Sequence, residues 1–374
     1  MEKENRPRWD DHDWPGLSPL SGDAEAEVCV VGLGGTGLTC ITEALALGAK
    51  SVIGIDASDV AAGAAGRNGG FLLAGTADFH HDAVALLGRE RAVAITRLTL
   101  DEMQRIAREV PGAVRFPGSV RIAASNEEAD DCDRQRRQML ADGLAVESYV
   151  GPEGRGLLIP TDGVFHPMRR CRTVAARALE QGARLFGHTT AREIASGRVR
   201  TDGGTIHARH VIVCVDGRLE LLVPDLAGEV RTARLQMLAT APAPEVSYPR
   251  AVYKRYGYDY WQQLLDGSIV FGGGRDTTPE TEWTTDSAPS DAIQDYLTRT
   301  LREDLKVNAE VTHRWAASVS YTETGLPVFR EMGDGLIVMG GYSGTGNVVG
   351  AVLGRAAAQR AIRGTSELAV PFIG

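Results

Sequence analysis

Cysteine, positive charge and long apolar runs are all in short supply in this sequence, and each shortage argues against a class of protein. Only five cysteines occur among 374 residues, and no two of them have a C-x-x-C spacing. A disulfide-stabilised secreted domain and a zinc ribbon both need more cysteine than this. We therefore expect a reducing, cytoplasmic setting in which Cys29, Cys40 and Cys214, which lie in apolar patterns, are small core residues.

The charge balance and the lack of long apolar runs limit the kinds of molecule that this protein is expected to bind. Lys and Arg total 40 against 49 Asp and Glu, so the net charge of -9 argues against nucleic acid or an anionic membrane as a partner. No apolar stretch approaches the ~20 residues that a membrane-spanning helix needs. The start, Met1 to Arg6, lacks the apolar centre of a signal peptide. We also expect no metal centre, because His80, His81, His207 and His210 have no partner at zinc spacing.

The most informative segment that is present is a strand, a glycine-rich loop and a helix near the N-terminus. Glu27 to Val31 is predicted to be a buried strand, Leu38 to Leu47 a helix, and Ser51 to Ile55 a second strand. Glycines between the first strand and the helix permit a tight turn and a close backbone approach to a pyrophosphate at the helix N-terminus. An acidic residue after the second strand is placed to accept hydrogen bonds from a ribose. The pattern predicts dinucleotide binding by Gly32, Gly34, Gly35, Thr36, Gly37 and Asp56.

The next segment distinguishes between dinucleotides. A nicotinamide-dependent dehydrogenase continues here into another helix, whereas this chain has a loop of small residues with one Arg and one Asn, Ala61 to Gly70. By composition alone this is also a flexible glycine loop. The Gly-Arg-Asn-Gly-Gly block, with the lead-in from Trp14 to Asp23, resembles the D-amino-acid oxidase-like FAD-dependent oxidoreductases, in the branch near gamma-glutamylputrescine oxidoreductase and the glycine and sarcosine oxidases. The resemblance implies FAD as cofactor and adds Gly66, Arg67, Asn68, Gly69 and Gly70 to its predicted site.

A second strand, glycine loop and helix occurs roughly 300 residues later. Gly335 to Met339 is predicted to be a buried strand, and a helix is expected from Val348 to Ile362. Gly346, Gly350, Gly354 and Ala358 recur every four residues, so one face of this helix is nearly bare and suited to close packing. The loop is similar to the family's C-terminal flavin motif, which implies that Gly341, Gly344, Thr345, Gly346 and Asn347 contact the flavin. The resemblance also places the backbone near Ala191 against the adenine.

The expected fold class is α/β plus α+β, with a Rossmann-type FAD-binding domain interleaved with an antiparallel-sheet substrate domain. Helices are predicted at 82–110 and at 126–140, the second capped by Asn126, and a single strand is predicted over 251–262. The predicted units are an N-terminal arm at 1–24 that wraps the surface, an FAD-binding domain at 25–85, 155–227 and 321–374, and a substrate domain at 86–154 and 228–320.

The resemblance implies that flavin removes a hydride from a C–N bond and that no protein nucleophile is needed. Alternation along 254–261 places Tyr256, Tyr258 and Tyr260 on one strand face, and sequence does not decide which face meets the flavin. Arg275, after a glycine run, is suited to holding a substrate carboxylate, although a surface ion pair is equally compatible. The substrate-pocket candidates are Arg275, Tyr258, Tyr260 and Tyr342, and packing is the alternative role of the tyrosines.

Two departures from the family pattern bear on activity. The stretch 316–321 lacks the carboxylate-binding Arg that amino-acid oxidases of the family place there, and Arg occurs only at 314. Val270 stands where sarcosine oxidases have Lys, and no Cys follows residue 214, so FAD attachment through a Cys near Val319 is excluded. The leading interpretation is oxidation of an amine or amino acid by non-covalent FAD, with oxygen or another acceptor. The alternatives are a nicotinamide-dependent dehydrogenase and a flavin-binding protein without turnover.

Overall fold

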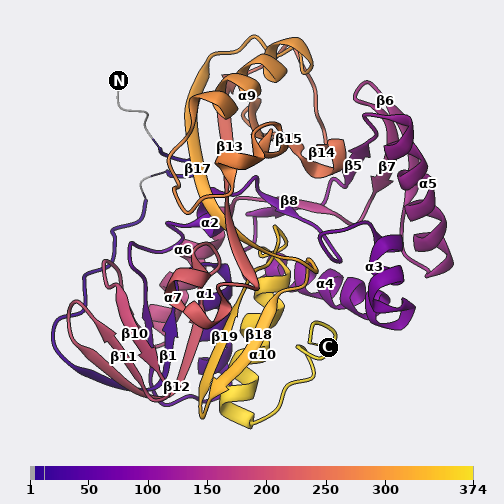
Figure 1. Ribbon diagram of the computed structural model, residues 1–374. Coiled ribbons are helices and arrows are strands. Elements are labelled where there is room, and N and C mark those ends of the chain that lie inside the picture. Colours follow the sequence, from indigo (N-terminus) through magenta and orange to yellow (C-terminus); the bar gives the residue numbers. More distant parts are fainter. Residues whose placement is uncertain (1–4, 12, 374) are drawn as a thin grey trace.

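Residues 5–11 and 13–373 are described by a computed structural model, in which two eight-stranded sheets face each other across a small third sheet (Figure 1). The first sheet has a parallel core in which β9, β2, β1, β12 and β19 lie side by side. Its central strands are nearly continuous apolar runs, because helices or other chain segments cover both faces. Its strands are β1 (Ala24–Val31), β2 (Val52–Ile55), β9 (Arg184–Phe186), β10 (Ala191–Ala195), β11 (Arg198–Thr201), β12 (Thr205–Cys214), β18 (Val328–Gly333) and β19 (Leu336–Gly340).

Helices α1 and α10 pack closely against each other beside the first sheet. A Cβ built on Gly354 would lie 2.4 Å from the backbone oxygen of Thr36, so the bare face of α10 is a close crossing with α1. Helix α4 joins the same layer, because Arg355 of α10 is buried and pairs with Glu102 and Glu109 of α4. The helices of this layer are α1 (Gly35–Ala46), α4 (Arg89–Glu109), α6 (Pro167–Glu180) and α10 (Val349–Arg363).

The second sheet is antiparallel apart from one parallel pair, β14 with β5. Helix α9 covers one of its faces through Ile293, Leu297 and Leu301, and in Figure 1 it lies on the side away from the first sheet. The strand order is β17 (Val311–Thr322), β13 (Val230–Pro242), β16 (Ser268–Gly273), β15 (Asp259–Gln263), β14 (Ala251–Lys254), β5 (Ser119–Ile122), β7 (Gly154–Ile159) and β6 (Glu147–Gly151). The helices beside it are α3 (His80–Leu87), α5 (Asn126–Ala141), α8 (Pro279–Glu282) and α9 (Asp291–Glu303).

A small sheet and short helices connect these two parts of the fold. The third sheet pairs β8 with both β3 and β4, and Phe71 of β3 packs with Val164 of β8. Its strands and the short helices are β3 (Phe71–Leu72), β4 (Val114–Arg115), β8 (Gly163–Phe165), α2 (Ala64–Arg67) and α7 (Leu219–Leu222), with 3-10 turns at Pro224–Leu226, Arg255–Gly257 and Arg275–Thr277. The predicted fold class, a Rossmann-type domain interleaved with an antiparallel-sheet domain, is confirmed.

Several predicted elements differ from the structure, for local reasons. The single strand over 251–262 is wrong: Arg255 and Tyr256 both have positive φ, and the chain reverses there between β14 and β15. The helix over 82–110 is divided at Gly88, whose φ is +83°. The cap of α5 is Ser125, whose side chain accepts a hydrogen bond from the Glu128 N–H, rather than Asn126.

The predicted domain limits also differ in detail from the packing. Strand β7 pairs with β5 and β6 of the second sheet. The predicted boundary at residue 155 assigns most of β7 to the FAD-binding domain instead. Helix α4 lies within the predicted substrate segment but packs with α10. The described part of the N-terminal arm does more than cover the surface, because Trp9 is 2% exposed and packs in one hydrophobic cluster with Met168 and Trp315. Residues 1–4 and 12 lie outside the described residues.

Candidate functional site

The first glycine loop lies at the N-terminus of α1. A Cβ on Gly37 would lie 1.9 Å from the Gly32 backbone oxygen, and a Cβ on Gly34 would lie 3.2 Å from the Ala65 side chain, so both glycines are closely packed. No described side chain caps α1, so the first N–H groups of the helix are available to a ligand. An anionic phosphate is the ligand that such a helix end favours. Gly32, Gly34, Gly35, Thr36 and Gly37 lie in this loop and the first turn of α1, and their contact with FAD remains a prediction.

Asp56 stabilises this loop through hydrogen bonds to its backbone. Its carboxylate accepts hydrogen bonds from the backbone N–H groups of Leu33 and Ser58, both at 2.9 Å. Burial raises the pKa of Asp56, and the two backbone hydrogen bonds act in the opposite direction. The backbone oxygen of Asp56 accepts from Thr189 at 2.8 Å, which brings the segment leading to Ala191 alongside the end of β2. Ribose and adenine contacts by Asp56 and Ala191 remain predictions.

The Gly-Arg-Asn-Gly-Gly block and the C-terminal loop meet directly. Asn68 and Asn347 exchange amide hydrogen bonds at 3.1 and 3.2 Å, and Asn347 also donates to the Phe71 backbone oxygen at 3.0 Å. Arg67 donates to the backbone oxygens of Ala62 and Ala316, so its guanidinium ties this block to β17. The structure therefore joins the two predicted flavin motifs, and it gives Arg67 a structural role beside the predicted one.

A buried acid, Asp216, shapes the C-terminal loop. Its carboxylate accepts from the backbone N–H groups of Tyr342 at 3.1 Å and Ser320 at 3.2 Å, and burial raises its pKa to about 6. The loop bends at Gly341 and Gly344, where φ is +65° and +91°, and no described atom lies within 4 Å of a Cβ built on Gly344. Asp216 is not among the site residues predicted from the sequence. An acid at the carboxyl end of a buried parallel strand is the signal that could have identified it.

The strand register shows which face of the second sheet meets the glycine loops. Tyr260 is paired with Tyr253 on one side and Gly272 on the other, so these residues lie on the same face. The Tyr260 ring lies 5.9 Å from that of Phe71, and a Cβ on Gly69 would approach it to 3.3 Å. Gln262, two residues along, donates to the Gly69 backbone oxygen at 2.6 Å. The Tyr260 face is therefore the one directed at the predicted flavin loop, and α9 covers the other.

Arg275 lies in an aromatic cage beyond this face. Its guanidinium carbon is 4.6 Å from the ring centre of Tyr321, 5.2 Å from that of Trp283 and 5.4 Å from that of Tyr258. Burial raises the pKa of the Tyr321 hydroxyl, and the neighbouring Arg275 acts in the opposite direction. No carboxylate of the described residues forms an ion pair with Arg275, so the surface ion pair considered from the sequence is absent there. Aromatic rings, rather than acids, hold this cation in place.

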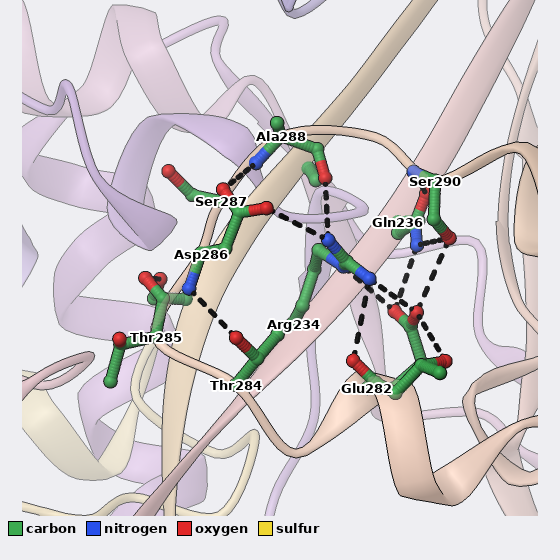
Figure 2. Close-up of polar contacts among 12 residues, drawn as sticks. Arg234, Gln236, Glu282, Thr284, Thr285, Asp286, Ser287, Ala288 and Ser290 are labelled. Carbon is green, nitrogen blue, oxygen red and sulfur yellow. Dashed lines mark hydrogen bonds and ion pairs between the residues drawn. The ribbon is translucent and has the colours of Figure 1, made fainter.

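The segment that carries Trp283 is anchored by a buried polar network, which Figure 2 shows. Glu282 is fully buried and accepts hydrogen bonds from Arg234 at 2.7 Å and from Gln236 at 2.8 Å. Arg234 also donates to the backbone oxygen of Ala288 at 3.0 Å, and Gln236 to the Ser290 hydroxyl at 2.7 Å. Because both ends of the loop 283–290 are tied to β13, the Trp283 ring is held over Arg275.

The structure separates the four substrate-pocket candidates. It brings Tyr258 to Arg275 at a chain reversal, and Tyr260 to the Gly69 loop on β15. It does not bring Tyr342 to them, because that side chain is 3% exposed and packs in the core with α1 and α10. Trp283 and Tyr321 were missed, and no local pattern marks them, since they meet Arg275 only through tertiary contacts.

No metal-binding group of His, Cys, Asp or Glu occurs in the described residues, and none of their helices is long and apolar enough to cross a bilayer.

The chain is similar to known flavin-dependent enzymes in sequence and in fold. The family described as FAD dependent oxidoreductase (DAO) matches residues 27–360. The probable oxidoreductase OrdL of Rhizobium meliloti is 27% identical, and the match covers 93% of this chain and 86% of that protein. Gamma-glutamylputrescine oxidoreductase of Escherichia coli is 24% identical, with the same two coverages, 93% and 86%. Glycine oxidase from Geobacillus kaustophilus has the same fold, with a TM-score of 0.76 at 21% identity, covering 94% of this chain and 100% of that one.

Proposed function

This chain belongs to the FAD-dependent oxidoreductase family, and we propose that it oxidises the C–N bond of an amine or amino acid. FAD is the cofactor of this family, which argues against the nicotinamide alternative. The names of similar proteins, glycine oxidase and gamma-glutamylputrescine oxidoreductase, support an amine or amino acid as the substrate class. The observation that carries the proposal is that the Tyr260 face, with Arg275 at its edge, lies against the loop that begins the predicted flavin contact.

The described residues fit FAD. The N-terminus of α1 offers uncapped N–H groups beside Gly34, which has no side chain to separate a pyrophosphate from them. Open space at Gly344 and the Asn68–Asn347 pair would border the flavin ring. All five cysteines are buried, and none follows residue 214, so we propose that FAD is held without a covalent bond.

The proposed reaction needs no protein nucleophile. When bound, FAD accepts the hydride that leaves the carbon next to the substrate nitrogen. The nitrogen loses a proton, a C=N bond forms, and water converts the imine to a carbonyl compound and an amine or ammonia. We propose molecular oxygen as the final acceptor, which yields hydrogen peroxide. The protein's contribution is to orient the substrate and to exclude water from the reacting carbon.

Arg275 and its cage supply the orienting group. A guanidinium without an acidic partner can take a substrate carboxylate in a bidentate geometry. The rings of Tyr258, Trp283 and Tyr321 restrict water around it, which strengthens that interaction. Arg275, in the 3-10 turn after β16, would thus replace the carboxylate-binding Arg that the stretch 316–321 lacks.

A visible spectrum of the purified protein, followed by a substrate panel, tests the proposal. We expect oxidised-flavin bands and release of FAD by heat or acid. Anaerobic addition of one class of amine or amino acid should bleach these bands, and admission of oxygen should restore them with hydrogen peroxide. A protein that carries FAD but is bleached by no member of a broad panel, including gamma-glutamylputrescine, glycine and proline, would favour flavin binding without turnover. A protein without flavin bands would contradict both.

A further inference from the structure

The N-terminal arm reaches the Gly-Arg-Asn-Gly-Gly loop, which is predicted to contact the flavin. The side-chain oxygen of Asn5 accepts a hydrogen bond from the Arg67 guanidinium at 2.9 Å. Farther along the arm, Asp10 forms an ion pair with Arg172 of α6, also at 2.9 Å. The arm is therefore fixed to the folded chain on both sides of Trp9.

Trp9 places its indole directly against this loop. The side chain is 2% exposed and lies in one cluster with Val270 and Trp315, and a Cβ built on Gly70 would be 3.2 Å from the ring. The indole N–H donates to the backbone oxygen of Asn68 at 2.7 Å. Because tryptophan has one donor and no acceptor, this is the one hydrogen bond that the buried ring can make. It fixes the direction of the Asn68 carbonyl.

The peptide groups that follow Asn68 differ in whether their N–H groups have partners. The backbone oxygens of Gly69 and Gly70 accept from the Gln262 amide at 2.6 and 3.1 Å, and the Gly70 N–H donates to the Asn68 side chain at 2.9 Å. In contrast, the Gly69 N–H donates to no atom of the described residues, although Gly69 is buried. A buried backbone N–H is rarely left without an acceptor, so this group is one that a ligand would satisfy.

Trp9 determines the direction of this free N–H. The carbonyl of residue 68 and the N–H of residue 69 belong to one planar peptide group and point in opposite directions. Since the indole holds the carbonyl, the N–H is directed to the other side of the loop. Position 69 also excludes a side chain, because a Cβ there would lie 2.4 Å from the Phe71 ring. The backbone itself is therefore what a ligand meets at this point.

From these observations we propose that Trp9 is a positioning residue for the flavin, which orients the 68–69 peptide so that the Gly69 N–H donates a hydrogen bond to the flavin ring. The inference rests on the FAD of the proposed function and not on its substrate. An N–H dipole directed at the ring stabilises the negative charge that the ring gains when it accepts a hydride. The arm thus makes bound FAD easier to reduce, which favours oxidation of the substrate.

The equilibrium between bound FAD and a reference dye of known potential tests this role without a substrate. Trp9→Phe keeps an aromatic ring and removes the donor. We expect the equilibrium constant for FAD reduction to fall about 10-fold, the scale of one buried hydrogen bond to a charged group. That ratio corresponds to about 30 mV for a two-electron couple. Trp261→Phe is the matched control and should leave the constant unchanged, because Trp261 is also buried and its indole N–H has no partner among the described residues.

A second variant acts on the arm and leaves the indole intact. Arg172→Ala removes the ion pair that follows Trp9, so the arm is held less firmly and the constant should fall by a smaller factor. A purely structural role of the arm would weaken the binding of oxidised and reduced FAD equally and would leave the equilibrium constant unchanged in both variants.

The inference is overturned if the constant in Trp9→Phe equals or exceeds that of wild-type protein, or if Trp261→Phe lowers it as much. If Trp9→Phe does not fold, Arg172→Ala decides, and an unchanged constant there overturns the inference. Failure of the proposed function gives a different result. Wild-type protein without flavin bands would overturn both, whereas a flavin that no amine or amino acid bleaches, with the dye equilibria as expected, would contradict only the proposed turnover.

Discussion

Asn68 and Asn347 are 279 residues apart in sequence, yet their side-chain amides form a reciprocal pair of hydrogen bonds. Each amide also bonds to backbone: Asn68 accepts from the Gly70 N–H at 2.9 Å, and Asn347 donates to the Phe71 oxygen. The pair therefore fixes both predicted flavin loops relative to each other and to β3. Two glycine-rich loops, which are conformationally free by themselves, become one rigid surface.

Removal of either member of this pair should weaken FAD binding. Asn347→Ala removes both hydrogen bonds between the two amides and the hydrogen bond to the Phe71 oxygen, at a cost of about 1–3 kcal/mol. We expect the Kd of FAD to rise about 10-fold, measured by fluorescence titration of the apoprotein. The loss in the double variant with Asn68→Ala should be smaller than the sum of the two single losses, because both single variants remove the reciprocal pair of bonds. Exposed Asn308→Ala is the control, and fully additive losses would show that the pair does not act as a unit.

Gly34→Val should separate cofactor binding from folding. A Cβ at this position would lie 3.2 Å from the Ala65 side chain and require a small shift of that methyl group, so we expect the melting temperature of the apoprotein to fall by only a few degrees. The added side chain occupies the space beside the free N–H groups of α1, and FAD content should fall to background. Gly228→Val, at a glycine with no described atom within 4 Å of its Cβ position, should retain FAD. An FAD-loaded Gly34→Val protein would show that the pyrophosphate lies elsewhere.

The crossing of α1 and α10 should be intolerant of one methyl group. In Gly354→Ala the new Cβ lies 2.4 Å from a backbone oxygen of α1, and a helix backbone cannot yield as a flexible side chain does. We expect the free energy of unfolding to fall by about 1–3 kcal/mol in urea titrations. Gly228→Ala should change it by less than about 0.5 kcal/mol. A neutral Gly354→Ala would mean that the two helices can separate without loss.

Arg275→Ala should affect substrates according to their carboxylate. If an amino acid is oxidised, its KM should rise about 30-fold or more, as expected for loss of a buried charged hydrogen bond of ~2 kcal/mol or more. The flavin spectrum and the kinetics of simple amines should stay near the wild-type values. Arg231→Ala is the matched control, because Arg231 lies over the same Trp283 ring at 4.5 Å but is exposed. Unchanged amino-acid kinetics would remove Arg275 from substrate binding.

His166 should make the fold sensitive to mild acid. Its Nδ1 accepts a hydrogen bond from the Arg169 N–H at 3.1 Å at the start of α6, and burial, with the nearby Arg169, lowers its pKa from 6.5 to about 4. Between these values the unfolded chain binds more protons than the folded one, so this contribution to stability is present above pH 6.5 and is lost as the pH falls toward 4. His166→Asn keeps an acceptor without the titration.

We therefore expect the melting temperature to fall less between pH 7 and pH 5 in His166→Asn than in wild-type protein. Exposed His207→Asn should leave the wild-type pH dependence unchanged. Equal slopes in all three proteins would show that His166 is protonated without cost to the folded state.

The sequence by itself determined the parts whose signals are local. The run Glu27 to Asp56 encodes a strand, turn and helix within 30 residues, and the glycines of that turn have few other uses. The C-terminal loop carries its own signal in the same way, including the four-residue spacing of Gly350 and Gly354. Close backbone approach requires glycine at a defined position, so the residue type alone reveals the geometry.

Tertiary structure decided everything that depends on pairing between distant segments. The reversal at Arg255 and Tyr256 uses residues that ordinarily avoid positive φ, so alternation predicted one strand where the chain forms two. Which face of β15 meets the glycine loops follows from strand register, which no local pattern contains. Arg275 is caged because Trp283 and Tyr321 arrive from other elements, and Tyr342 is buried because its loop turns that side chain into the core. Special backbone geometry requires particular residue types and can therefore be predicted from the sequence, whereas contacts between distant side chains depend on how the whole chain packs.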